Sequence, residues 1–132
     1  MDKKDILLSP IKIGTRTSEN RIFVQAMECN DADADGNPTD LTYQRYENLF
    51  KGEAGLISLE AITITDKNRS RMNQLFIMPK NQAALAKFVG RMREVNPKPL
   101  FIFQLTHSGE LSNPAFSKRL SVRPLRGYTA DV

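Results

Sequence analysis

The sequence has 132 residues, of which 40% are hydrophobic and 26% charged, and its formal net charge is +4. This length accommodates one domain with a hydrophobic core and is short for two. The composition is ordinary for a globular protein, and no apolar run approaches the roughly 18 residues that a membrane span needs. The single cysteine, Cys29, excludes an internal disulfide, and the N-terminus lacks a signal-peptide core, so we expect a cytoplasmic protein.

The first third of the chain predicts a short hairpin, one strand and one helix. The segment "ILLSPIKIG" is typical of a small N-terminal hairpin or edge element, which we place at about residues 5–20. Residues 21–27 ("RIFVQAM") are apolar and β-branched enough for a buried strand. A polar loop leads to a predicted helix over 39–51, whose N-terminus can be capped by Thr39 or Asp40.

A second strand, a second helix and a third strand follow. Residues 55–63 form another apolar run of strand length, and residues 80–95 carry the clearest helical pattern. Residues 99–105 ("PLFIFQL") return to strand character. The helical stripe consists of Leu85, Phe88, Val89, Met92 and Val95. This β-α-β-α-β order, with strands apolar on both faces, predicts parallel strands that neighbour one another in chain order and are covered by helices.

Polar residues stand at the ends of the predicted strands, the edge at which parallel α/β sheets bind ligands. Glu60 interrupts an apolar strand, where a carboxylate is costly unless it is paired or near solvent. It is either a salt bridge inside the core or part of a functional site. Alternation along the third strand places Gln104 on one face and Phe101 and Phe103 on the other. The polar cluster that begins at Gln104 is either ordinary turn chemistry or faces a ligand.

The acidic loop "DADADG" resembles the first half of a calcium-binding loop, with Asp31, Asp33 and Asp35 at ligand positions. The bidentate glutamate that closes such a loop is replaced by Thr42, and a strand rather than a helix precedes it. We therefore expect an acidic turn that caps the following helix, without bound calcium.

Common catalytic and metal-binding patterns are missing. The sequence has no G-x-S-x-G, no G-x-G-x-x-G and no P-loop, and its one histidine cannot build a metal site alone. Cys29 either faces a ligand or is an idle thiol. We predict no catalytic residue and no metal ligand in this sequence.

Four basic residues gather near the end of the chain: Lys118, Arg119, Arg123 and Arg126. Such a run either meets phosphates or forms a solvated tail. The sequence has neither zinc-finger spacing nor a basic stripe interleaved with aromatic residues, so we predict no nucleic-acid partner and no membrane partner.

Three segments resemble, in order and spacing, the N-terminal part of the old yellow enzyme family of flavin-dependent NAD(P)H oxidoreductases, which includes dienoyl-CoA reductases. They are "SPIKIGTRTSENRIFVQAM", "DGNPTDLTYQRYENLFKGEAGLISLEA" and "FIFQLTHSGE", and the likeness runs over residues 8–110. The resemblance implies an α/β fold that is the N-terminal part, about three β/α units, of a TIM-type (β/α)8 barrel over residues 1–132.

The resemblance also implies FMN as the cofactor, with NAD(P)H as the reductant. Ala26, Met27 and Glu28 would lie behind the flavin ring, Ala61 would offer a backbone contact, and Gln104 would bind the pyrimidine edge. An amide suits that edge because it both donates and accepts hydrogen bonds. The histidine of the last motif, His107, would be structural.

The sequence departs from the family pattern at several positions. Gln25 and Ala26 replace a more usual Ala-Pro, Glu28 replaces a Thr, Cys or His, and Glu110 replaces an Arg. A carboxylate at position 28 would disfavour the anionic reduced flavin.

A whole barrel needs about 250 residues, so the chain would depend on the remainder of the barrel, which would supply the substrate-anchoring pair and the phosphate site. The resemblance implies an ene-reductase-type enzyme that passes hydride from reduced flavin to an activated alkene or related small-molecule acceptor. The alternative is a non-catalytic module or assembly piece. The sequence leaves homo-oligomerisation open.

Overall fold

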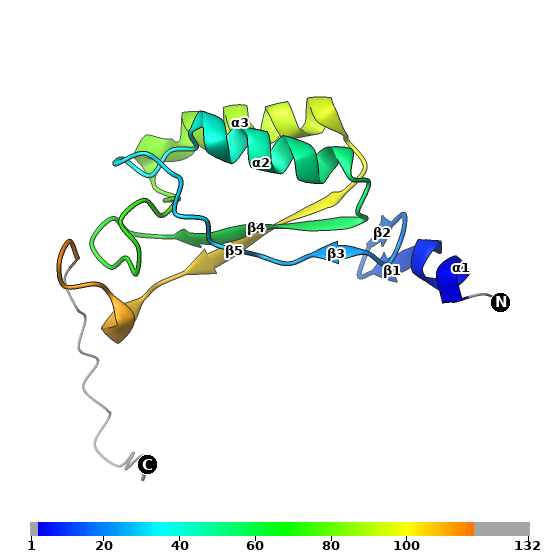
Figure 1. Cartoon of the computed structure of the whole chain (residues 1–132), viewed down its shortest axis with the longest axis horizontal. Helices are drawn as coiled ribbons and strands as arrows, with labels where there is room; N and C mark the ends of the chain where they lie inside the picture. Colours follow the sequence, from blue (N-terminus) through cyan, green and yellow to red (C-terminus); the bar gives the residue numbers. More distant parts are fainter. Residues whose placement is uncertain (1–2, 118–132) are drawn as a thin grey trace, which may run out of the picture.

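A three-stranded parallel sheet with two helices on one face forms the centre of the computed structural model, which describes residues 3–117 (Figure 1). In these residues no helix is long and apolar enough to cross a membrane. The four basic residues from Lys118 to Arg126 lie outside the described part of the chain. The elements in chain order are α1 (Lys3–Leu8), β1 (Ile11–Ile13), β2 (Arg16–Ser18), β3 (Phe23–Val24), α2 (Asp40–Lys51), β4 (Leu56–Thr63), the 3-10 turn Pro79–Asn81, α3 (Gln82–Val95), β5 (Leu100–Thr106) and the 3-10 turn Gly109–Leu111.

The N-terminal segment contains a helix that the sequence did not predict. The antiparallel hairpin β1–β2 spans Ile11 to Ser18 and turns at Gly14, whose φ is 59°. The residues before it, expected as part of the hairpin, form the six-residue helix α1 instead. A helix of this length is too short to show a repeating apolar face, which explains the difference.

The central sheet confirms the predicted order of parallel strands, β3-β4-β5. The first strand is much shorter than the predicted 21–27, because only Phe23 and Val24 pair with β4, opposite Leu56 and Ile57. Beyond Val24 the chain leaves the ladder; the rest of β4 pairs with β5, and Thr63 at its end also forms an isolated parallel bridge with Phe76. Apolar character indicated an extended segment, but it does not reveal where ladder hydrogen bonds end.

Helices α2 and α3 cover the same face of the sheet (Figure 1). Thr39 caps α2, as expected, and Gly52 ends it. Phe88 of α3 is fully buried and makes edge-to-face contacts with Tyr43 and Tyr46 of α2, at 5.2 and 5.4 Å between ring centroids. Buried residues of this core include Tyr46, Phe50, Ile57, Leu59, Ile62, Leu75, Leu85, Phe88 and Met92.

The opposite face of the sheet carries apolar side chains that no helix covers. Phe101 and Phe103 of β5 pack against the core, as alternation predicted, whereas Ile102 between them is 42% exposed. On β3, Val24 packs against the core and Phe23 is 42% exposed. We call this the open face of the sheet.

Candidate functional site

The candidate site lies at the carboxyl ends of the three parallel strands, where loops connect the sheet to its helices. The ladder between β4 and β5 is irregular there. Leu59 pairs with Phe103 and Ile62 pairs with Leu105, so Glu60 and Ala61 together stand opposite Gln104. Two residues facing one is a β-bulge, a feature that is common beside functional sites.

The backbone of the bulge is held from the helix layer. The Glu60 N–H donates a 2.7 Å hydrogen bond to the hydroxyl of Tyr46 on α2. Burial is the main cause that raises the pKa of Tyr46 to about 12, so the hydroxyl stays protonated at neutral pH.

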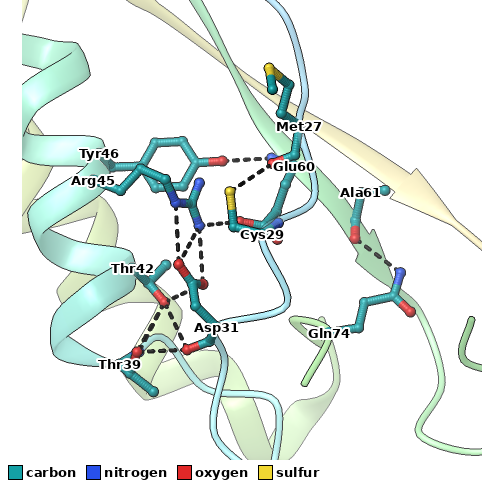
Figure 2. A network of polar contacts seen from close by, with 10 residues as sticks. All are labelled: Met27, Cys29, Asp31, Thr39, Thr42, Arg45, Tyr46, Glu60, Ala61 and Gln74. Carbon is teal, nitrogen blue, oxygen red and sulfur yellow. Dashed lines mark hydrogen bonds and ion pairs between the residues drawn. The ribbon is translucent and has the colours of Figure 1, made fainter. Parts of the chain in front are cut away.

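Glu60 is 1% exposed and its carboxylate is paired (Figure 2). Of the two roles that the sequence allowed for this residue, the buried salt bridge is therefore present. The guanidinium of Arg45 contacts Glu60 Oε1 at 2.5 Å and Asp31 Oδ2 at 2.9 Å, and the Cys29 N–H donates to Glu60 Oε2 at 3.2 Å. Burial raises the pKa of Glu60 although the Arg45 contact opposes it. Burial acts to lower the pKa of Arg45, but its bonds to Asp31 and Glu60 prevail and raise it.

Cys29 is exposed, and its thiol lies 3.6 Å from the carbonyl oxygen of Met27. Partial desolvation of the sulfur is the main cause that raises the pKa of the thiol. The nearby Arg45 charge lowers this pKa and the Glu60 charge raises it, and the net result is an increase. The surroundings of Cys29 therefore do not activate its thiol as a nucleophile.

Glu28 is not a free carboxylate. Its Oε2 accepts a 2.8 Å hydrogen bond from Arg71 Nε, and its Oε1 accepts a 2.7 Å bond from Gln74 Nε2. Gln74 is 1% exposed, and the same Nε2 donates to the Ala61 carbonyl oxygen at 3.1 Å. The sequence did not indicate Arg71 or Gln74, because both lie in a polar loop without periodicity.

The five residues that the sequence predicted for the cofactor all lie at this edge of the sheet. Glu28 and Ala61 share the amide of Gln74, and Ala61 stands opposite Gln104 across the bulge. Ala26 is half-buried just beyond β3, Met27 is 71% exposed, and Gln104 is exposed on the open face.

His107 takes part in the turn that follows β5. Its Nδ1 accepts a 3.1 Å hydrogen bond from the Gly109 N–H, and the ring is exposed. The loops after β4 and β5 meet through Arg69, whose guanidinium lies 4.8 Å from the ring centre of Phe76 and 5.4 Å from that of Phe116.

The three aspartates of the acidic loop have separate partners. Asp31 pairs with Arg45, Asp33 accepts hydrogen bonds from Asn37, and Asp35 lies 3.3 Å from Lys80. Among residues 3–117, no three acidic, histidine or cysteine side chains gather closely enough to hold a metal ion.

The three parallel strands and their two covering helices have counterparts among solved structures. A scan against models of protein families and a search of curated proteins found no match. The old yellow enzyme from Trypanosoma cruzi matches with a TM-score of 0.72 and 23% identity, over 85% of this chain and 29% of its own. Morphinone reductase in complex with tetrahydroNAD matches with a TM-score of 0.73 and 23% identity, over 85% of this chain and 30% of its own.

The old yellow enzyme homologue from Zymomonas mobilis matches with a TM-score of 0.68 and 26% identity, over 79% of this chain and 28% of its own. The chain therefore has the fold of an N-terminal portion of the old yellow enzyme barrel. It spans 28–30% of the length of these three structures.

Proposed function

We propose that this chain forms the first β/α units of an FMN-binding barrel, and that the complete barrel is an NAD(P)H-dependent oxidoreductase of the ene-reductase type. One observation carries the proposal. The exposed amide of Gln104 lies on the open face, opposite the bulge at Glu60 and Ala61, at the carboxyl edge of three parallel strands.

The residues at this edge fit a flavin. Within residues 3–117 the Gln104 side chain makes no hydrogen bond, so its donor and its acceptor are both free for the pyrimidine edge. Ala26 and Ala61 have small side chains that allow close approach to the backbone, and the exposed Met27 offers an apolar contact. The Glu28 carboxylate is paired with Arg71, which lessens its repulsion of an anionic reduced ring.

FMN, when bound, would supply the redox chemistry, taking hydride from NAD(P)H and passing it to an activated alkene or a related acceptor. The part of this chain would be to hold and orient the ring through Gln104 and the backbone near Met27 and Ala61. The groups that bind the flavin phosphate and orient the acceptor would come from the remainder of the barrel.

A second candidate is a non-catalytic assembly piece, and the open face favours it. Phe23 and Ile102 are each 42% exposed, and the outer edges of β3 and β5 have no partner strand among the described residues. Such a surface needs a covering partner before it can support chemistry.

Flavin binding by the whole gene product tests the proposal. The purified protein should carry flavin absorbance, and Gln104→Ala should weaken FMN retention or shift the reduction potential of the flavin. Gln44→Ala is a matched control, because Gln44 is an exposed glutamine on α2. Wild-type flavin content and potential in Gln104→Ala would show that the role of Gln104 is wrong, and a colourless protein that takes up no added FMN would favour the assembly piece.

A further inference from the structure

We propose that Arg45 and Tyr46, adjacent residues of α2, are positioning residues that set the geometry of the cofactor edge. Neither side chain is assigned to touch the flavin. They act through Glu60, Cys29 and Asp31, and so fix the segments that carry Met27, Glu28 and Ala61. This inference rests on the proposed function and identifies what shapes its site.

The need for such residues follows from the short first strand. The ladder between β3 and β4 ends at Val24 and Ile57, before the chain reaches the residues 26–28. Those residues therefore have no strand pairing to hold them at a fixed distance from β4. A segment that orients a planar ring requires such a constraint, because productive geometry tolerates only small displacements.

The Arg45 network replaces the missing ladder. The Cys29 N–H binds one oxygen of Glu60, and Arg45 binds the other oxygen together with both oxygens of Asp31. One guanidinium thus ties the loop after β3 to the end of β4. The planar fork of arginine suits this role, since it presents several donors in a rigid arrangement.

Tyr46 fixes the position of the bulge backbone relative to α2. The bulge leaves the Glu60 N–H to an acceptor outside the regular ladder, and the Tyr46 hydroxyl is that acceptor. The Tyr46 ring is itself immobilised. Phe88 packs edge-on at 5.4 Å, Phe101 lies at 6.1 Å, and the Arg45 guanidinium covers the ring at 4.6 Å from its centre.

The location of the network allows a positioning role to be distinguished from a role in folding alone. Its members meet the backbone at Cys29 and Glu60, each next to a residue predicted to contact the flavin. The network's hydrogen bonds and ion pairs lie at the cofactor edge, whereas Phe50 and Met92 of the core make none of them. Loss of those bonds should therefore disturb the cofactor edge more than the helix-covered core.

The test uses Tyr46→Phe and Arg45→Met in the whole gene product, with Tyr43→Phe and Arg91→Met as matched controls. Tyr43 lies on the same helix and also packs against Phe88, but its hydroxyl makes no hydrogen bond within the described residues. Arg91 makes ion pairs with Glu47 and Glu94 at the surface of the helix layer.

We expect Tyr46→Phe and Arg45→Met to weaken FMN binding about tenfold and to change the visible spectrum of bound flavin, because each leaves a buried polar group without its partner. The controls should match wild type in both. In the protein without flavin, the amide resonances of Ala61 and Cys29 should shift in the two test variants and not in the controls.

Two failures are distinguishable. A wild-type protein that binds no FMN overturns the proposed function, and the amide resonances then decide the positioning role by themselves. If Tyr46→Phe and Arg45→Met lower the melting temperature but leave FMN affinity, flavin spectrum and the Ala61 and Cys29 resonances at control values, the network is purely structural and the inference is wrong.

Discussion

The two faces of the central sheet have different roles: one forms the hydrophobic core and the other is exposed. On the covered face, β5 contributes Phe101 and Phe103 to a core of interlocking aromatic rings. On the open face, two residues of the same strand, Ile102 and Gln104, are exposed. Alternation along one strand thus assigns neighbouring residues to different tasks. Changes on the covered face should alter folding, and changes on the open face should alter binding and assembly.

The largest effect is expected when the open face is left without its partner. The 132-residue chain alone, supplied with excess FMN and cyclohexenone, should oxidise NAD(P)H no faster than free FMN. Orientation of reactants contributes several orders of magnitude in rate, and this chain would lack the groups that orient the acceptor. Steady-state assays against a free-flavin control make the measurement. Turnover well above that control would show that the chain is complete as an enzyme.

Phe88→Ala tests the covered face. Phe88 is fully buried and contacts rings from α2 and β5, so the truncation should lower the free energy of unfolding by about 3–5 kcal/mol. Denaturant titration of the whole gene product measures it, with the exposed Leu41→Ala as the control. A loss below about 1 kcal/mol would mean that the two helices do not pack on the sheet as described.

Ile102→Ala tests what covers the open face. In a complete barrel Ile102 would point into a filled interior, and the substitution should cost about 2 kcal/mol. In the 132-residue chain, where Ile102 is 42% exposed, the same change should cost less than about 1 kcal/mol. Equal losses in the two proteins would argue against a barrel interior at this position.

The smallest expected effect is a pH dependence that arises from Glu60. Burial raises its pKa in the folded protein above the ordinary value of 4.5, so the unfolded chain loses this proton first as the pH rises. Between 4.5 and the raised pKa, the unfolded state binds fewer protons, and the free energy of unfolding falls with increasing pH. Glu60→Gln should remove this part of the slope. If the free energy of unfolding changed with pH in the same way for wild type and variant from pH 4 to 8, the assignment of this slope to Glu60 would be wrong.

Long apolar runs made most of the fold predictable. The strand at 55–63 and the helix at 80–95 correspond closely to β4 and α3, because burial of a continuous face leaves a periodic or uninterrupted apolar pattern. The six-residue α1 left no such pattern. The length of β3 was overestimated because an extended segment keeps its apolar character after its ladder bonds have ended.

The candidate site was predictable only in part. Glu60 and Gln104 could be found because a polar side chain within or at the end of an apolar strand is conspicuous. Their surroundings could not: Arg45 has the appearance of an ordinary surface residue of α2, and Gln74 lies in an aperiodic loop. Which polar groups meet is decided by tertiary packing, which local sequence does not record.

The bulge in β4 also constrains how this strand can change in length. Ile62, just beyond the bulge, is fully buried in the core. Side chains along a regular strand alternate with a period of two, so Leu59 and Ile62, three residues apart, share the core face only because the bulge adds one residue between them. Loss of either Glu60 or Ala61 would make the strand regular and leave Ile62 opposite Leu105, still on the core face. A single-residue deletion at the bulge should therefore preserve the core while changing the backbone of the candidate site.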